Sequence, residues 1–341
     1  MSYHHGISEI RIGELSKSSI SLSRTVASFR GQCTLNVTHS KLGTGSEGFY
    51  HDVRILPGMP IHLPHGRTGA VCLTLDFDAV SLWLGTFGLK TPAYLSRGEY
   101  GARVGVPRLL SLLDKYQIKT TWFVPGHTVD TYPELVRDIS RRGHEIAHHG
   151  YCHENPAALK EEEESGVLLK GITSIQAVTG QRPVGYRSPA WDVSDNTIKL
   201  LRSHDFKYDS SLMADDYTPY RCRIGDKPFT DRAFEFGEET DIIEFPVSWS
   251  LDDWPQFEYA FWAPSVWPGL RQASAVLENW EADFEYMLEN LSPGVFVLTM
   301  HPQVIGRGHR MKMLEKLIRS MVSRPEVCFT RLADLAQSWK D

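Results

Sequence analysis

The sequence lacks the features that mark a membrane protein or a nucleic-acid-binding protein. A run of about 18 apolar residues, the length that spans a bilayer, occurs nowhere in the chain. Positive charge is not in excess, since 36 basic and 42 acidic residues give a formal net charge of −6. This balance provides no attractive field for a phosphate backbone or an anionic lipid surface. We therefore expect no nucleic acid and no membrane among its partners.

The sequence is also poor in cysteine and shows no secretory leader. The five cysteines are odd in number and include no Cys-x-x-Cys spacing, so a disulfide framework is not expected. Serine, lysine and glutamate interrupt the apolar residues between Ile7 and Leu22, which leaves no apolar segment for a signal peptide. Reduced thiols and the missing leader predict a cytoplasmic protein.

The first 65 residues differ in composition from the rest of the chain. Serine and threonine are frequent there, apolar residues are scattered, and three prolines (Pro57, Pro60 and Pro64) close the stretch. Too few apolar residues occur to build an independent core. We expect a loop-rich N-terminal extension over residues 1–65 and one main domain over residues 66–341.

From residue 70 onward, short apolar segments alternate with segments of helical spacing. This alternation predicts an α/β protein with a parallel sheet, either open or closed as a barrel. Strands are expected over residues 70–76, 120–124, 145–148, 184–186, 242–246 and 295–300. Helices are expected over residues 107–116, 132–142, 161–178, 194–204, 273–290 and 310–321, with a long loop over 81–101.

Unusual polar and aromatic residues gather where these predicted strands end. Ligand sites of parallel α/β proteins lie at the carboxyl ends of their strands, so this placement indicates a single site. The residues at or just beyond the strand ends are Asp76, Asp78, His149, Arg187, Trp249 and His301.

Residues 144–148 read His-Glu-x-x-His, the motif of many zinc proteases. The motif requires a helix, because only there do residues four apart share one face. Gly143 and Gly150 leave room for a strand only, and on a strand His144 and His148 would lie about 13 Å apart. A protease is therefore disfavoured.

A second histidine pair, His149 and His153, begins at the end of the strand, and Gly150 allows a turn that brings both rings together. Two imidazoles and one carboxylate, with open positions for water, form a catalytic metal site. Asp76 and Asp78 can supply the carboxylate, and the second acid can then act as a base. Taken alone, two surface loop histidines remain the alternative.

Two further residues suit proton chemistry. Arg187 follows a predicted strand and could hold a carboxylate in a bidentate clamp, although a surface arginine explains it equally well. His301 follows the buried strand 295–300 and suits a general acid, with a structural histidine as the ordinary alternative.

The residues described above, in their order along one α/β chain, make the sequence similar to the polysaccharide deacetylase (NodB-homology) superfamily of carbohydrate esterases. The resemblance covers residue 67 to the C-terminus and is closest to the branch of cyclic imide hydrolases, metal-independent allantoinases and peptidoglycan-deacetylase-like proteins. It rests on LDFD (75–78), HHGYCHE (148–154), GYRSPAW (185–191), YDSSLM (208–213), PVSWSLDD (246–253) and LTMHPQ (298–303).

The resemblance implies a distorted (β/α) barrel with fewer than eight regular strands. It also implies a divalent metal ion, by preference zinc, with Asp78, His149 and His153 as its ligands. The metal-independent allantoinases lack the full ligand set, whereas all three ligands are present here.

The resemblance further assigns the proton carriers. Asp76 matches the catalytic base, Arg187 its orienting partner, and His301 the acid that protonates the departing nitrogen. The superfamily's commonest motif has two adjacent aspartates, whereas Phe77 separates them here, which makes the assignment of the base less direct than that of the metal ligand.

Three functions are compatible with these residues. The first expectation is hydrolysis of a small cyclic imide, ureide or related amide, because the predicted location is cytoplasmic and the aromatic stretch 249–267 indicates a covered pocket. N-deacetylation of an amino sugar or its polymer is the alternative, and a non-catalytic binding protein on the same barrel is the third. The expected substrate contacts are Trp191, Trp249 and Glu99, and the aromatic stretch also suggests a homo-oligomer.

Overall fold

The computed structural model describes residues 61–63, 66–262 and 265–339. The predicted extension over residues 1–65 therefore lies almost entirely outside the described residues. Among the described residues, Ile61 pairs with Trp339 in an isolated antiparallel bridge. No helix in the described ranges is long and apolar enough to cross a membrane.

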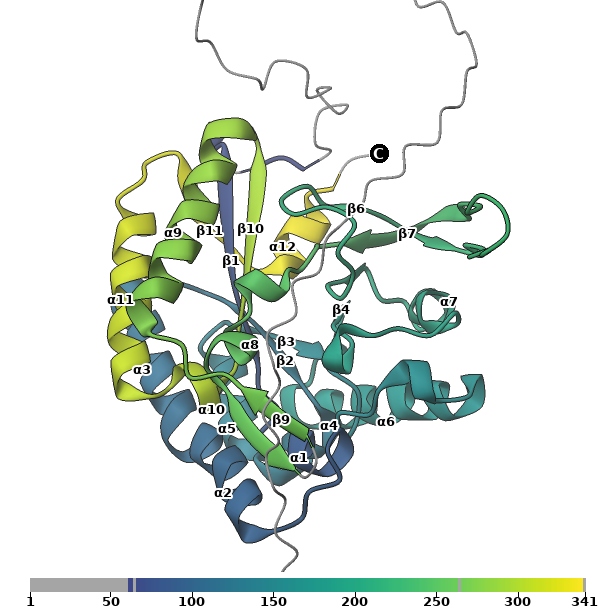
Figure 1. Ribbon diagram of the computed structural model, residues 1–341, viewed down its shortest axis with the longest axis horizontal. Coiled ribbons are helices and arrows are strands. Elements are labelled where there is room, and N and C mark those ends of the chain that lie inside the picture. Colours follow the sequence, from purple (N-terminus) through teal and green to yellow (C-terminus); the bar gives the residue numbers. More distant parts are fainter. Residues whose placement is uncertain (1–60, 64–65, 263–264, 340–341) are drawn as a thin grey trace, which may run out of the picture. The chain divides into compact units, whose positions relative to one another are not determined.

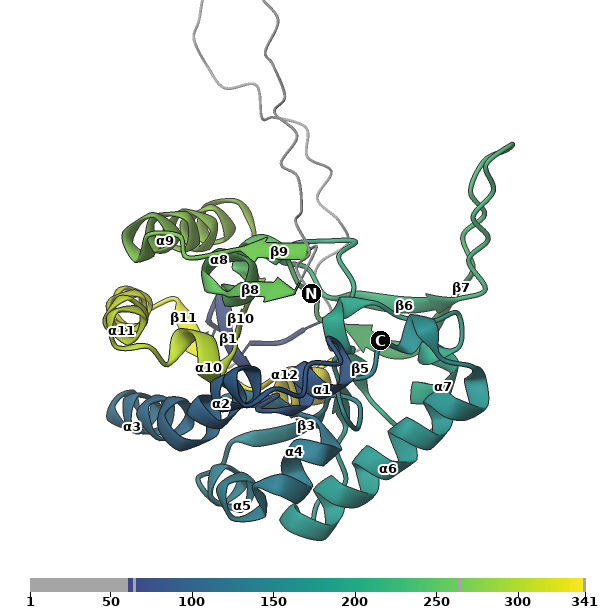
Figure 2. The ribbon, with the colours of Figure 1, turned by 60° about the horizontal axis from the view of Figure 1, so that its bottom comes forward.

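A curled sheet of parallel strands forms the centre of the fold, with helices packed around it (Figures 1 and 2). The strand order is β10-β1-β2-β3-β4-β5-β7-β6, and every pair along it is parallel except the antiparallel pair of β7 and β6. The strands are β1 (Gly69–Asp76), β2 (Thr121–Val124), β3 (Glu145–His148), β4 (Gly185–Tyr186), β5 (Tyr208–Asp209), β6 (Tyr220–Ile224), β7 (Glu238–Glu244) and β10 (Gly294–Met300). The predicted α/β fold, a distorted (β/α) barrel, is confirmed; eight strands lie along this path, of which β4 and β5 have only two residues each.

The remaining strands lie beside this path. β11 (Val327–Phe329) pairs with β1, and β8 (Tyr259–Trp262) and β9 (Ser265–Pro268) form a separate antiparallel hairpin. Within the described ranges, β10 and β6 do not pair with each other, so the barrel stays open. The backbone bridge between Asp252 and Thr299 spans part of this opening.

Most helices surround the sheet on its convex side, whereas α12 (Leu332–Gln337) lies at the centre and contributes Leu332 and Leu335 to the core inside the sheet (Figure 2). The longer ones are α3 (Val106–Tyr116), α5 (Pro133–Arg141), α6 (Glu161–Thr179), α7 (Thr197–Ser203), α9 (Ala273–Asn290) and α11 (Gly308–Val322). The shorter ones are α1 (Ser81–Gly85), α2 (Pro92–Tyr100), α4 (Gly126–Thr131), α8 (Asp253–Phe257), α10 (Pro302–Ile305) and α12 (Leu332–Gln337).

The two faces of β1 explain how the sheet orients its functional side chains. Val71, Leu73 and Leu75 belong to the large apolar core that includes the surrounding helices. Ala70 and Cys72 belong instead to the smaller core that also includes Phe123 of β2 and Phe245. Side chains alternate along a strand, so Thr74 and Asp76 also face this inner side. The carboxylate of Asp76 is thus directed into the barrel by the alternation alone.

The expectation of a long loop over residues 81–101 is wrong. The chain there forms α1, α2 and a π-helical turn (Gly101–Gly105) that continues into α3. Pro92 stands in the first turn of α2, where a proline is well tolerated. The apolar pattern of α2 is weak because, of its nine residues, Gly98 alone is buried, at the point where the helix packs against the backbone of Ala79.

Gly98 generates a prediction about this packing. A Cβ atom at Gly98 would come within 2.4 Å of the backbone carbonyl of Ala79, one residue after Asp78. Gly98→Ala should therefore lower the free energy of unfolding by about 1–3 kcal/mol, measured by urea denaturation. Gly166→Ala is the matched control, because its Cβ would meet nothing within 4 Å on an exposed turn of α6. This control should be stabilising by about 0.5–1 kcal/mol, and equal losses in both variants would contradict the packing argument.

Candidate metal centre and active site

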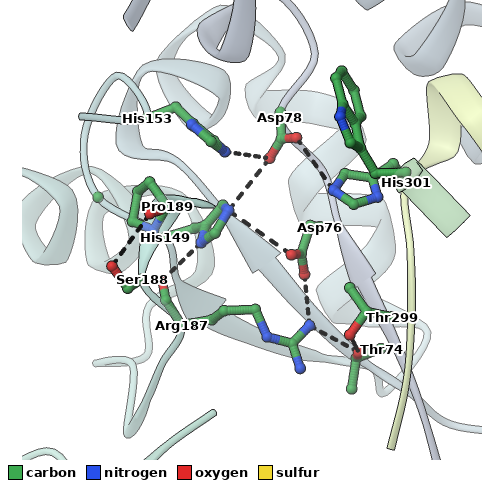
Figure 3. A network of polar contacts seen from close by, with 12 residues as sticks. Thr74, Asp76, Asp78, His149, His153, Arg187, Ser188, Pro189, Thr299 and His301 are labelled. Carbon is green, nitrogen blue, oxygen red and sulfur yellow. Dashed lines mark hydrogen bonds and ion pairs between the residues drawn. The ribbon is translucent and has the colours of Figure 1, made fainter. Parts of the chain in front are cut away.

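The predicted site residues converge at the carboxyl ends of the strands (Figure 3). Asp78 Oδ1 lies 3.6 Å from His149 Nε2 and 3.8 Å from His153 Nε2. One ligand atom from each of these three residues falls within 4.8 Å of the other two. Gly150 has a φ of +69°, a conformation that favours glycine, and it turns the chain between the two histidines.

The other ring nitrogen of each histidine is already engaged. His149 Nδ1 donates to the carbonyl oxygen of Arg187 at 2.7 Å. Thr86 donates its hydroxyl proton to the carbonyl oxygen of His153, so its Oγ1 must accept from His153 Nδ1 at 2.6 Å. Both Nε2 atoms therefore present a lone pair toward Asp78. Burial lowers the pKa of His149 to about 3 and the pKa of His153 well below its usual value, so both rings are neutral at pH 7.

Asp78 provides the test of whether these residues suit a cation. Both of its carboxylate oxygens are buried and have no hydrogen-bond partner among the residues that the structure describes. Burial raises the pKa of Asp78 well above its usual value, which shows that the isolated anion is unfavourable there. A divalent cation between Asp78, His149 and His153 would satisfy the carboxylate and both lone pairs. The donor set of two imidazoles and one carboxylate fits a catalytic zinc-type site.

Asp76 lies beside this group and is held by Arg187. Arg187 Nη1 donates to Asp76 Oδ1 at 2.8 Å, and both side chains are buried. The expected bidentate clamp is not formed, because the other donors are used elsewhere: Nη1 also reaches Thr74, and Nε and Nη2 bind the carbonyl and hydroxyl oxygens of Ser210 at 2.9 and 2.8 Å. Asp76 Oδ2 stays 3.9 Å from His149 Nε2 and faces the candidate metal centre.

His301 lies on the opposite side of Asp78, with Nε2 at 3.9 Å from Asp78 Oδ2 (Figure 3). Its Nδ1 pairs with Asp253 Oδ1 at 2.7 Å, a partner that the sequence analysis did not assign. Burial alone would lower the pKa of His301, but the nearby carboxylates, Asp252 and Asp253 foremost, outweigh it and raise the pKa to about 10. His301 is thus protonated at neutral pH, with Nε2–H directed to the site.

A cavity of about 180 Å³ opens onto these groups. Trp191 and Trp249 pack against each other at its edge, with ring centroids 4.3 Å apart and ring planes tilted by 34°, and Trp249 stays 42% exposed. Glu99, in contrast, lies on α2 with its carboxylate bonded to Arg103, and it does not line the cavity. The lining residues are Asp76, Leu82, Thr86, Phe87, His149, His153, Ala190, Trp191, Trp249, Asp252, Trp254, Trp267 and His301.

The His-Glu-x-x-His motif takes no part in this site. It lies on β3 rather than on a helix, as expected from its flanking glycines. His144 Nδ1 accepts a hydrogen bond from the backbone N–H of Thr120, and His148 Nε2 bonds with the carbonyl oxygen of Leu168. These contacts direct the two rings away from the cavity, which removes the basis for a zinc protease.

The barrel and this set of groups at its carboxyl end define an α/β-barrel hydrolase, and comparison with known proteins gives its family. Residues 97–208 match the family described as polysaccharide deacetylase. The chain is 38% identical over 279 residues to the "Peptidoglycan deacetylase" of Helicobacter pylori, covering 77% of this chain and 94% of that protein. It is 31% identical over 316 residues to the "Peptidoglycan deacetylase-like protein FGM2" of Gibberella zeae, covering 85% and 92%. The chain therefore belongs to the polysaccharide deacetylase family, whose members hydrolyse carbon–nitrogen bonds other than peptide bonds.

Solved structures agree with this assignment. A Mycobacterium smegmatis protein, provisionally named as a polysaccharide deacetylase, superposes with a TM-score of 0.73 at 38% identity, over 83% of this chain and 94% of that one. The allantoinase Puue shares the fold, with a TM-score of 0.66 at 23% identity over 84% and 94% of the two chains.

The candidate metal centre generates a prediction about metal content. His149→Ala removes one lone pair from the group around Asp78, so the purified variant should lose most of its bound divalent metal in elemental analysis. His144→Ala, at the opposite end of β3 and directed away from the cavity, should retain the metal content of the wild type. Metal retained in the first variant, or lost only in the second, would contradict the assignment of ligands.

A buried acid pair supports the site from behind. Asp209 and Glu244 lie opposite each other on β5 and β7. Glu244 Oε1 accepts the backbone N–H groups of Ser211 and Leu212 at 2.9 and 3.0 Å, which fixes the turn that carries Ser210. Burial, and then repulsion by Asp209, raise the pKa of Glu244 well above its usual value, while burial raises the pKa of Asp209 to about 6. The pair therefore holds at least one proton near neutral pH.

This proton makes stability depend on pH. A native pKa raised above the unfolded value contributes stability below the unfolded pKa, and that contribution is lost as pH rises toward the native pKa. Glu244→Gln cannot lose a proton, so its free energy of unfolding relative to wild type should rise by at least about 1 kcal/mol between pH 5 and pH 8. Urea unfolding at both pH values measures this, with Glu238→Gln on the exposed start of β7 as the control. A difference that is the same at both pH values would refute the shared proton.

Proposed function

We propose that this protein is a metal-dependent N-deacetylase that hydrolyses the acetamido group of an N-acetylated amino sugar within a glycan. The main support is the 38% identity to a named peptidoglycan deacetylase over 94% of that protein's length. The presence of Asp78, His149 and His153 beside an acid and a base is consistent with it. This proposal takes the second of the substrate classes expected from the sequence in place of the first.

The metal centre and the base would act together on water. A divalent cation held by Asp78, His149 and His153 would polarise the scissile carbonyl and lower the pKa of a water molecule. This set of donors favours zinc as the cation. Asp76 lines the cavity beside these ligands and is suited to accept the proton of that water. Arg187 keeps the carboxylate of Asp76 in place through a bond of 2.8 Å, so its free oxygen stays directed to the cavity.

His301 is suited to protonate the departing nitrogen. An amine leaves poorly as an anion, and a proton delivered as the C–N bond breaks removes that barrier. Asp253 fixes the orientation of the ring by its bond to Nδ1, and the raised pKa of His301 keeps Nε2 protonated until that step. After turnover Asp76 holds a proton and His301 lacks one, so exchange with solvent restores both groups.

The packed pair of Trp191 and Trp249 would hold the sugar ring. The exposed face of Trp249 offers an apolar surface at the rim of the cavity, on which a pyranose ring can pack. The cavity behind this surface admits the smaller acetamido group. A compact cyclic imide or ureide is the second candidate substrate, because a volume of about 180 Å³ lined by aromatic rings also suits a small planar molecule.

A substrate panel tests the proposal. The zinc-reconstituted enzyme, offered chitin oligomers, peptidoglycan fragments, succinimide, hydantoin and allantoin, should release acetate from the glycans. Asp76→Asn and His301→Ala should retain the metal but lose about 10²–10⁴ in kcat, the usual contribution of a positioned proton carrier. Ring opening of the imides without acetate release would overturn the proposal in favour of the second candidate. Tight glycan binding without any turnover would indicate a non-catalytic binding protein.

A further inference from the structure

One polar residue of the cavity has no part in the chemistry proposed above. Asp76, His149, His153 and His301 are the metal ligands and proton carriers that line it, and the hydroxyl of Thr86 is used by His153. Among the other lining residues, aromatic and aliphatic side chains predominate, and the one remaining ionisable group is the carboxylate of Asp252.

The two oxygens of Asp252 are in different situations. Oδ1 accepts the backbone N–H of Trp254 at 2.8 Å, as the N-cap of α8, and lies 3.5 Å from His301 Nδ1. Oδ2 receives no hydrogen bond from any residue that the structure describes, although Asp252 as a whole is only 2% exposed. Because Asp252 lines the cavity, this oxygen is available to accept a hydrogen bond from a ligand bound there.

We propose that Asp252 is a specificity-determining residue that accepts a hydrogen bond from a hydroxyl group of the substrate's sugar ring. This inference rests on the proposed deacetylase function. Burial raises the pKa of Asp252 to about 7, and its ionised form can only accept hydrogen bonds, so it selects a substrate that carries a donor close to the scissile amide. A sugar that carries hydroxyl groups around its acetamido group provides such a donor.

The position of Asp252 also limits where this donor lies. The carboxylate adjoins His301, the residue that faces the departing nitrogen, so the bound hydroxyl belongs to the same ring as the acetamido group rather than to a distant unit of the glycan. A buried site that hydrogen-bonds a substrate hydroxyl discriminates strongly against an analogue without it, because the carboxylate oxygen then stays unpaired.

The experiment compares substrates and variants in one matrix. The zinc-reconstituted enzyme is assayed for acetate release from an N-acetylglucosamine tetramer and from its 3-deoxy and 6-deoxy analogues. Asp252→Asn and Asp252→Ser are compared with wild type, because Asn and Ser both remain good N-caps and should preserve α8. Glu278→Gln on the exposed face of α9 is the control for a change of charge.

The wild type should favour the parent tetramer over one deoxy analogue by about 10–100-fold in kcat/KM, as expected for a hydrogen bond to a charged group. That ratio should fall to within about threefold of unity in Asp252→Ser, with an intermediate value in Asp252→Asn and no change in Glu278→Gln. The same pattern should appear in the dissociation constants measured by calorimetry with metal-free enzyme, where no turnover occurs.

Other outcomes distinguish a failure of the deacetylase function from a failure of the role of Asp252. A wild type that releases no acetate from any tetramer overturns the deacetylase function and this inference with it. Acetate release with equal rates on parent and deoxy substrates overturns the role of Asp252 alone. A loss in Asp252→Ser that is equal for all substrates and shifts the alkaline limb of the pH–rate profile would mean that Asp252 acts on His301 and not on the substrate.

Discussion

The buried ion pair between Arg187 and Asp76 organises the site and the barrel around it. Asp76 ends β1 and Arg187 follows β4. These two strands are separated in the sheet by β2 and β3, so the contact between the side chains requires the sheet to be curled. Removing one partner of such a pair would leave a buried charge, at a cost of about 3–5 kcal/mol. The guanidinium also packs 4.1 Å from the ring of Phe123, and its remaining donors bind Thr74 and Ser210. The curvature of the sheet, the ion pair between Arg187 and Asp76 and the position of the base therefore depend on one another.

The same arginine also links the base to the metal centre. Its side chain holds Asp76, while its backbone carbonyl accepts the Nδ1 proton of His149 and so sets the tautomer of that ring. A shift of the segment around Arg187 would displace a proton acceptor and a metal ligand together. Behind it, Ser210 depends on the turn held by Glu244, so acids that never reach the cavity still contribute to its geometry.

Burial acts on the three histidines of the site in different ways. At His149 and His153 desolvation is the largest influence on the pKa, and it keeps both rings neutral and available as ligands. His301 is equally enclosed, but the paired acids Asp252 and Asp253 keep it cationic. One type of side chain thus provides both lone pairs for a cation and a proton for a leaving group, and the neighbouring carboxylates decide which.

Several properties of this protein were determined by the sequence itself. The alternation of apolar strands with amphipathic helices predicted the parallel sheet, while the family resemblance implied its barrel form. The strand ends at Asp76, His148 and Met300 were readable because buried strands are continuous apolar runs. Gly143 and Gly150 excluded a helix for the His-Glu-x-x-His motif. Local patterns suffice where a feature depends only on residues close in the chain.

The tertiary structure decided what depends on residues far apart. It paired His301 with Asp253, 48 positions earlier, through the approach of the segment at Asp252 to β10. It replaced an expected loop by α2, and it placed Glu99 on the exposed side of that helix, bonded to Arg103. It also left Oδ2 of Asp252 without a partner among the described residues. None of these is visible in sequence, because hydrogen-bond partners, burial and protonation are properties of the space around a side chain and not of its neighbours along the chain.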